Sequence, residues 1–164
     1  MSLEVELGFP ASPDRVFRLF SDPEVVTAKY ESAGATGVTL DECGPDGTGF
    51  RLTTTRTVAS PVPAFAAKLL PSRNTITQTE RWGPEVDGAR AGEWEVSVHG
   101  VPIRMRGSMS LTGDDGSTRY RVSGEVTVGI PLIGRRLAGF VVEDLEAKLA
   151  SEHRFGTAWL GGAK

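Results

Sequence analysis

Cysteine and histidine are scarce in this chain of 164 residues. Cys43 is the single cysteine, and His99 and His153 are the two histidines. One cysteine cannot form an internal disulfide, which agrees with a reducing compartment. Two histidines far apart in sequence, with no cysteine cluster beside them, do not supply the ligand set of a zinc site. We therefore expect no metal site.

Long hydrophobic runs are also missing. No segment approaches the roughly 20 consecutive apolar residues that a membrane-spanning helix requires. The opening sequence MSLEVELGF carries acidic residues where a secretory signal peptide would have a basic region. These absences predict a soluble, cytoplasmic protein with no integral membrane segment.

Positive charge is not in excess. The chain has 18 lysines and arginines against 21 aspartates and glutamates, and its net charge is −3 at pH 7. The arginines are scattered along the sequence, so they do not form the basic stripe that is typical of nucleic-acid-binding proteins. We expect no nucleic-acid partner.

Two common sequence motifs are absent as well. Gly44, Gly47 and Gly49 do not have the dinucleotide-binding spacing, and no strand, glycine loop and helix of a parallel sheet surround them. They are interpreted as part of a hairpin turn. The Gly-x-Ser-x-Gly motif of a nucleophile elbow does not occur. We expect no cofactor and no hydrolase of that kind.

The N-terminal part of the chain predicts one strand and two short helices. Apolar and polar residues alternate from Leu3 to Phe9, which is the period of a strand with one buried face. Ser12-Pro13 and Asp22-Pro23 each place an N-cap residue before a proline, the usual start of a helix. The second helix is expected to end near Gly34.

Residues 36 to 128 predict an antiparallel meander. Segments rich in valine, threonine and aromatic residues are separated by short turn clusters, whereas a parallel pair would need a crossover of about a dozen residues. The six expected strands cover about 36–42, 49–59, 74–83, 92–100, 103–112 and 117–128. The one long connection, residues 60–72, contains three prolines and an apolar run. It is either a lid or portal beside a cavity, or a helical turn that caps the sheet edge.

The C-terminal part, from about residue 130 to 160, predicts one long helix. At 100° per residue, its apolar and small side chains fall on one side, which must face the sheet. They are Gly134, Ala138, Val141, Leu145, Leu149, Gly156 and Trp159. The sequence therefore predicts a single α+β domain over residues 1–164. A curved, seven-stranded antiparallel sheet wraps around the long helix, and two short helices follow the first strand.

This order of elements resembles the START-like superfamily. That superfamily, also called SRPBCC, helix-grip or Bet v 1-like, includes the birch-pollen allergen and polyketide cyclases. Within it, the chain resembles the uncharacterised actinobacterial family DUF2505. The matching stretches are Pro13 to Pro23, Pro61 to Phe65, Gln78 to Trp82 and Ile130 to Gly134. The resemblance implies the helix-grip fold and an internal cavity, and it carries no assigned reaction.

Several polar residues share a predicted face with apolar ones. Thr54 and Arg56 do so on one strand and Gln78 and Glu80 on the next, while Glu152 projects into the apolar side of the long helix. A charge at such a position is costly unless it is paired, so Arg56 is expected to pair with Glu80 or Glu152. The alternative is that these residues lie at strand ends or beyond a bulge and reach solvent.

The expected cavity lining adds apolar and aromatic side chains to these five residues. They are Trp82, Trp94, Val96, Met105, Met109, Tyr120, Val141, Leu145 and Leu149. The tryptophans have a second interpretation as ordinary core residues. A cavity of this composition suits a ligand with an apolar body and one oxygen-bearing end.

The sequence favours a binding module over an enzyme. The predicted ligand is a small hydrophobic or amphipathic molecule such as a lipid, an isoprenoid or a polyketide-like aromatic, and the protein is expected to be a monomer or a weak homodimer. One alternative is a cyclase or aromatase in which Arg56 stabilises an enolate and Glu80 or Glu152 moves a proton. Another is a regulatory domain that docks a partner protein through residues 60–72.

Overall fold

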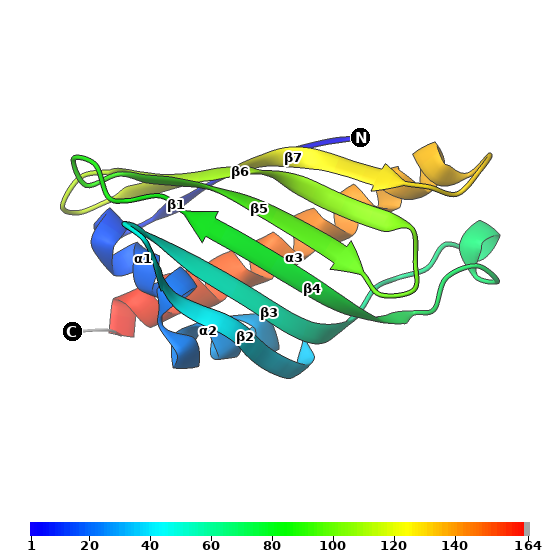
Figure 1. Cartoon of the computed structure of the whole chain (residues 1–164), viewed down its shortest axis with the longest axis horizontal. Coiled ribbons are helices and arrows are strands. Elements are labelled where there is room, and N and C mark those ends of the chain that lie inside the picture. Colours follow the sequence, from blue (N-terminus) through cyan, green and yellow to red (C-terminus); the bar gives the residue numbers. More distant parts are fainter. Residues whose placement is uncertain (163–164) are drawn as a thin grey trace.

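The structure is a computed structural model that describes residues 1–162. Within these residues, seven strands form one antiparallel sheet in the order β1-β7-β6-β5-β4-β3-β2 (Figure 1). The strands are β1 (Ser2–Phe9), β2 (Thr36–Asp46), β3 (Gly49–Ala59), β4 (Arg73–Trp82), β5 (Arg90–Val98), β6 (Ile103–Gly113) and β7 (Thr118–Val128). Strands β2 to β7 pair in sequence order, and β1 pairs with β7. The predicted meander is confirmed.

Two short helices follow β1, namely α1 (Pro13–Ser21) and α2 (Pro23–Ser32). Each begins with proline, whose missing N–H is not needed in the first turn. The Ser12 side chain accepts a hydrogen bond from the first turn of α1, and the Asp22 side chain accepts two from that of α2. The two helices lie together at one end of the sheet (Figure 1). The predicted caps are confirmed.

The long helix α3 (Gly134–Gly162) crosses the concave side of the sheet and contacts β7, β1 and both short helices (Figure 1). Its packing is closest at Gly156. A Cβ atom there would lie 2.8 Å from a Leu19 methyl carbon and 2.9 Å from the Phe9 ring. Glycine is therefore required for this contact rather than for ligand space. The predicted helix and its sheet-facing side are confirmed.

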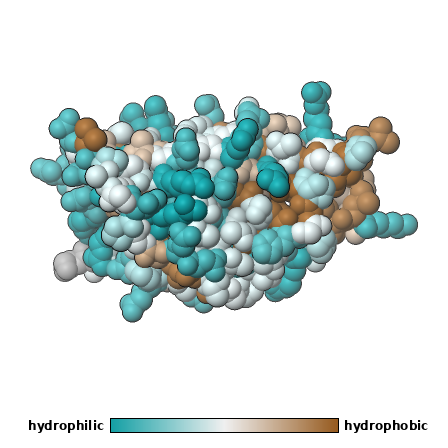
Figure 2. Space-filling model, viewed as in Figure 1, coloured by the Kyte–Doolittle hydropathy of each residue, from teal (hydrophilic) through white to brown (hydrophobic). Residues whose placement is uncertain are grey.

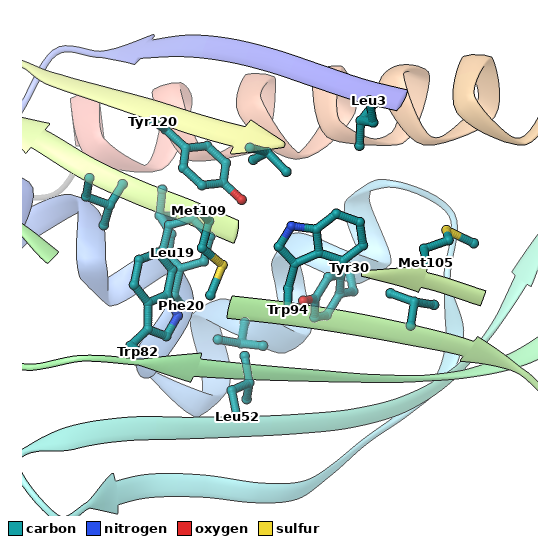
Figure 3. Close-up of a cluster of buried hydrophobic side chains, with 14 of the residues drawn as sticks. Leu3, Leu19, Phe20, Tyr30, Leu52, Trp82, Trp94, Met105, Met109 and Tyr120 are labelled. Atoms are coloured by element: carbon teal, nitrogen blue, oxygen red, sulfur yellow. The ribbon is translucent and has the colours of Figure 1, made fainter. Parts of the chain in front are cut away.

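The densest part of the core lies between the short helices and the sheet. The ring of Phe20 is 5.2 Å from that of Trp82 and 5.1 Å from that of Tyr120, measured between centroids. Figure 3 shows the side chains of Leu19, Phe20 and Trp82 gathered there. Aromatic pairs at these separations contribute beyond the burial of their area. This packing closes one end of the sheet.

The end of one predicted strand needs correction. The strand expected over 36–42 continues to Asp46, because pairing with β3 resumes after a register shift between Leu40 and Glu42. The turn then falls at residues 47–48 instead of 44–47. The long connection 60–72 contains one 3-10 turn, Ala64–Ala66, and no strand.

No helix within residues 1–162 is both long and apolar enough to cross a membrane.

Candidate ligand-binding cavity

An internal cavity lies between the sheet and α3. The space open to the centre of a water-sized sphere is about 130 Å³, well above the roughly 15 Å³ that one water molecule needs. Its wall is mainly apolar and comes from every strand except β2 and from α1, α2 and α3. Outside residues 60–72, the apolar lining is Leu3, Phe20, Val58, Ile76, Trp94, Val96, Val98, Ile103, Met105, Met109, Val122, Leu137, Phe140, Val141, Leu145 and Leu149.

Among residues 1–162, nine polar side chains other than Tyr120 line this space. Four of them, Ser60, Asn74, Asp144 and Lys148, lie in or near the segment 60–72 and its contacts with α3. The other five are called the polar cluster here. They are Lys29, Arg56, Gln78, Glu80 and Glu152. They come from α2, β3, β4 and α3, so only the folded chain brings them together. The hydroxyl-bearing ring of Tyr120 also lines the cavity, and burial raises the pKa of that phenol well above its ordinary value. The cavity therefore combines an apolar body with ionisable groups.

Arg56 and Glu80 are joined through Gln78. The Arg56 guanidinium donates to the side-chain oxygens of Thr54 and Gln78, each at 2.8 Å. The Gln78 amide in turn donates to Glu80 Oε2 at 2.9 Å. The direct ion pair expected from the sequence is thus replaced by a bridged one, because adjacent strands place Gln78 between the two charges. Thr54 and Gln78 thus both accept hydrogen bonds from Arg56.

The Glu80 carboxylate has two further donors. The indole N–H of Trp82 donates to Oε1 at 3.0 Å, and the Tyr30 hydroxyl donates to Oε2 at 3.5 Å. The Tyr30 ring also lies 3.7 Å from the Arg56 guanidinium carbon, a cation–π contact. Burial and the nearby carboxylate raise the Tyr30 pKa well above its ordinary value, so it remains a donor. Arg56 and Glu80 are therefore held by protein groups.

Lys29 has a different environment. The residue is 3% exposed, and its Nζ lies 4.2 Å from the Phe20 ring centroid and 4.8 Å from that of Tyr30. Within residues 1–162, it makes no side-chain hydrogen bond, and no carboxylate oxygen lies within 4.0 Å of Nζ. Burial lowers the pKa of Lys29, and the charges of Glu80 and Glu152 oppose this only in part.

Glu152 is the second unpartnered member of the polar cluster. It lines the cavity from α3, and its carboxyl has no hydrogen bond or ion pair with any residue of the described part of the chain. Burial raises its pKa, while the charges of Lys29 and Arg56 act in the opposite direction. The carboxyl therefore favours its neutral form more than an exposed glutamate does.

The cavity reaches the surface beside residues 60–72. Pro61, Val62, Pro63, Leu70 and Pro71 line it there, opposite the first turns of α3. Ser60 Oγ donates to Asp144 Oδ2 at 2.9 Å, and Lys148 bonds to both residues. In Figure 2, the largest hydrophobic area of the visible face covers this end. The segment is thus held against α3 at the mouth of the cavity.

The structure brings together most of the predicted lining. Only Thr54 and Trp82 lie behind the cavity wall, where they support Arg56 and Glu80. Figure 3 shows Trp94, Met105, Met109 and Tyr120 directed into the space enclosed by the sheet. The other predicted ligand contacts, among them Val96, Val141, Leu145 and Leu149, are also part of the lining. Whether a ligand touches these residues stays a prediction.

Lys29 is the residue that the sequence analysis missed. It lies four positions after Val25 and three after Val26, so it shares the buried face of α2 with them. A lysine on the apolar face of a helix is a signal in the sequence that could have identified this residue. Within the described residues, no group of three or more histidine, cysteine or acidic side chains is arranged to hold a metal ion.

Comparisons with known proteins support the fold. The family model of DUF2505, described as a protein of unknown function, matches residues 4–160. The uncharacterized protein Rv0481c of Mycobacterium tuberculosis is 23% identical over 167 residues, which is 97% of this chain and 96% of that protein.

Two solved structures are similar over almost their whole length. TTHA0849 from Thermus thermophilus has a TM-score of 0.67 and 16% identity, with 100% of both chains covered. The Zhui aromatase/cyclase from Streptomyces sp. R1128 has a TM-score of 0.64 and 12% identity, with 98% of this chain and 95% of that one covered. Identities this low show a shared fold and nothing finer.

Proposed function

This chain belongs to the DUF2505 family, and from that premise we propose that it binds a small hydrophobic or amphipathic molecule in its internal cavity. The observation that carries the proposal is a mainly apolar cavity in which Lys29 and Glu152 have no hydrogen-bond or ion-pair partner within residues 1–162. Lys29 is buried and Glu152 is half-buried. Polar groups that lose water without gaining protein partners are costly, and a ligand with one polar end would supply a partner. Carrying or sequestering such a molecule is the proposed role.

The chemistry of the wall favours a ligand with an apolar body. Each 100 Å² of apolar ligand surface removed from water contributes roughly 2.5 kcal/mol before the cost of association. Met105 and Met109 add flexible side chains that adapt to irregular shapes. A lipid chain, an isoprenoid or a polyketide-like aromatic fits this description. The proposal does not require a cofactor.

Native mass spectrometry of freshly purified protein, followed by solvent extraction and accurate-mass analysis, tests the proposal. A near-stoichiometric apolar molecule is the expected result. Leu145→Trp, which fills the cavity from α3, should lower occupancy at least about ten-fold, equivalent to 1.4 kcal/mol. Glu146→Trp, on the exposed side of the same helix, should leave occupancy unchanged. Protein that is empty and binds no fatty acid, isoprenol or polycyclic aromatic would contradict the proposal.

A cyclase-like activity is the second candidate. The specific observation in its favour is the Glu152 carboxyl, whose raised pKa and position in the cavity suit proton transfer. Arg56, the expected stabiliser of an enolate, already donates to Thr54 and Gln78. Comparing Glu152→Gln with Glu80→Gln for turnover of a linear polyketide tests this assignment. Turnover that survives both substitutions would remove it.

A partner-docking role for residues 60–72 is the third candidate. Leu69 is 57% exposed in this segment, whereas the ring of Phe65 packs 5.7 Å from that of Phe140. An exposed leucine at the cavity mouth favours contact with another surface. Sedimentation of Leu69→Ser at several concentrations tests this role, and association equal to that of the unaltered protein would count against it.

A further inference from the structure

The four charged side chains of the polar cluster form two pairs, which differ in whether protein groups bond to them. Arg56 and Glu80 neutralise each other through Gln78, and both are held by protein hydrogen bonds. Lys29 and Glu152 remain. They line the same cavity and have no hydrogen-bond or ion-pair partner within residues 1–162. Within the polar cluster, the two charged groups without such a partner are therefore one amine and one carboxyl.

The surroundings of Lys29 act on its charge in both directions. The rings of Tyr30, on its own helix, and of Phe20, on α1, make cation–π contacts with its amine that favour the ammonium. Of the charged groups around it, Arg56 on β3 disfavours the ammonium, whereas Glu80 on β4 and Glu152 on α3 favour it. Burial is the largest influence and lowers the pKa of Lys29. A lysine in such a site offers a larger fraction of nucleophilic amine at neutral pH than an exposed one.

A neutral ligand end fits this arrangement better than a charged one. The polar cluster holds two basic side chains and two carboxyl groups, so a charged end of either sign would meet like charges as well as opposite ones. A carbonyl group carries no net charge. It can accept a hydrogen bond from the Glu152 carboxyl when that group is protonated, and present its carbon to the amine.

We propose that Lys29 forms an imine with an aldehyde or ketone at the polar end of the ligand, with Glu152 as the proton donor and acceptor. This inference rests on the proposed function and names the chemical class of the ligand. The amine nitrogen attacks the carbonyl carbon, and the carbonyl π electrons pass to oxygen, which takes a proton from the Glu152 carboxyl. The Glu152 carboxylate then takes up the proton that the nitrogen loses, which gives a carbinolamine.

Loss of water completes the imine. The carboxyl of Glu152 protonates the hydroxyl, the carbon–oxygen bond breaks, and the nitrogen lone pair forms the carbon–nitrogen double bond. The second nitrogen proton returns to the Glu152 carboxylate. The net change is amine plus carbonyl to imine plus water, so no oxidant or reductant is required. The arrangement makes the cavity a reversible covalent trap for reactive carbonyl compounds.

The test uses 3-phenylpropanal with sodium cyanoborohydride, which reduces an imine to a stable amine. A trapped adduct adds the mass of the aldehyde less one oxygen atom, and peptide mapping identifies the modified amine. The chain has only four lysines, Lys29, Lys68, Lys148 and Lys164, so assignment is direct. Lys68 is exposed and serves as the internal reference. The isosteric alcohol 3-phenylpropanol, which cannot form an imine, reports cavity binding alone.

At pH 7, we expect Lys29 to be trapped faster than Lys68, by about ten-fold for each unit by which burial lowers its pKa. Lys29→Met should abolish that adduct, and Lys68→Arg should change neither the adduct nor the binding of 3-phenylpropanol. Glu152→Gln should slow trapping and remove the pH dependence that its carboxyl causes. Because the decisive measurement is made on the unaltered protein, a variant that folds poorly does not affect it.

Two results would overturn the inference. If 3-phenylpropanol binds but Lys29 is trapped no faster than Lys68, the imine is wrong and the proposed cavity binding stands. If neither compound binds and no adduct forms at Lys29, the imine is wrong and the proposed function is weakened for ligands of this class.

Discussion

The two ends of the cavity are built differently. At the α1–α2 end, Phe20, Trp82 and Tyr30 are 2–3% exposed and pack around the polar cluster. At the opposite end, Leu69 and Phe140 are 57% and 40% exposed, and residues 60–72 are held to α3 mainly by side-chain contacts (Figures 1 and 2). The comparison assigns a different role to each end. The closed end stabilises the fold and holds the ionisable groups in place, and the open end provides the entrance to the cavity.

Truncation of a leucine at each end should show the largest contrast. Leu19 is 1% exposed and packs against Gly156, so Leu19→Ala should lower the free energy of unfolding by about 2–5 kcal/mol. Leu69→Ala should change it by less than about 0.5 kcal/mol, since that side chain is mostly in solvent. Urea denaturation of both variants checks this. Equal losses would remove the distinction between the two ends.

Removal of the Glu80 carboxylate should come next. Glu80→Ala leaves Arg56 without its bridged counter-charge and leaves the Trp82 N–H without an acceptor, which should cost about 3–5 kcal/mol. Glu95→Ala, which breaks only the exposed pair with Arg81, is the matched control and should cost at most about 1 kcal/mol. Thermal unfolding measures both. A small effect of Glu80→Ala would mean that solvent reaches the closed end.

The Glu152 carboxyl should contribute to the pH dependence of the free energy of unfolding. The pKa of Glu152 is raised on folding, so its stabilising contribution is complete below the unfolded value of 4.5 and is lost as pH rises through the folded pKa. A glutamine at this position does not titrate, so the Glu152→Gln variant does not lose this stability as the pH rises. The variant should therefore gain stability relative to the unaltered protein between pH 4 and pH 7, by about 1.4 kcal/mol for each unit by which the pKa is raised.

Unfolding curves at pH 4 and pH 7 give this difference directly. Glu143→Gln, on the exposed side of α3, is the control and should show no such change between the two pH values. A stability difference for Glu152→Gln that is the same at both values would show that the carboxyl titrates as it does in the unfolded chain.

The smallest expected effect is at the cavity mouth. Ser60→Ala removes one hydrogen bond to Asp144, worth about 0.5–1.5 kcal/mol. The loss should appear as faster amide hydrogen exchange confined to residues 60–72, with the exchange of β4 and β5 unchanged. Lys68→Ala, an exposed change in the same segment, is the control. Faster exchange throughout the sheet would show that this contact supports the whole fold.

The sequence predicted the fold well because its signals are local. Alternating residues in β1, proline after Ser12 and Asp22, and short turns between strands each act over a few positions. The predicted lining was also largely placed in the cavity, since residues two apart on a strand share a face. Thr54 and Trp82 lie behind the wall instead, where Thr54 bonds to Arg56 and Trp82 bonds to Glu80 and packs against Phe20.

Lys29 shows the limit of this approach. Its place on the apolar face of α2 was readable, but its proximity to Arg56, Glu80 and Glu152 depends on four elements meeting. Likewise, pairing register decided that Gln78 bridges Arg56 and Glu80.

The sequence by itself determined the order and type of the elements and the sheet-facing side of α3, because hydrophobic period and turn chemistry act within each segment. Only the tertiary structure decided which charges are satisfied and which face the cavity. The physical reason is that desolvation and hydrogen bonding depend on atoms contributed by distant parts of the chain.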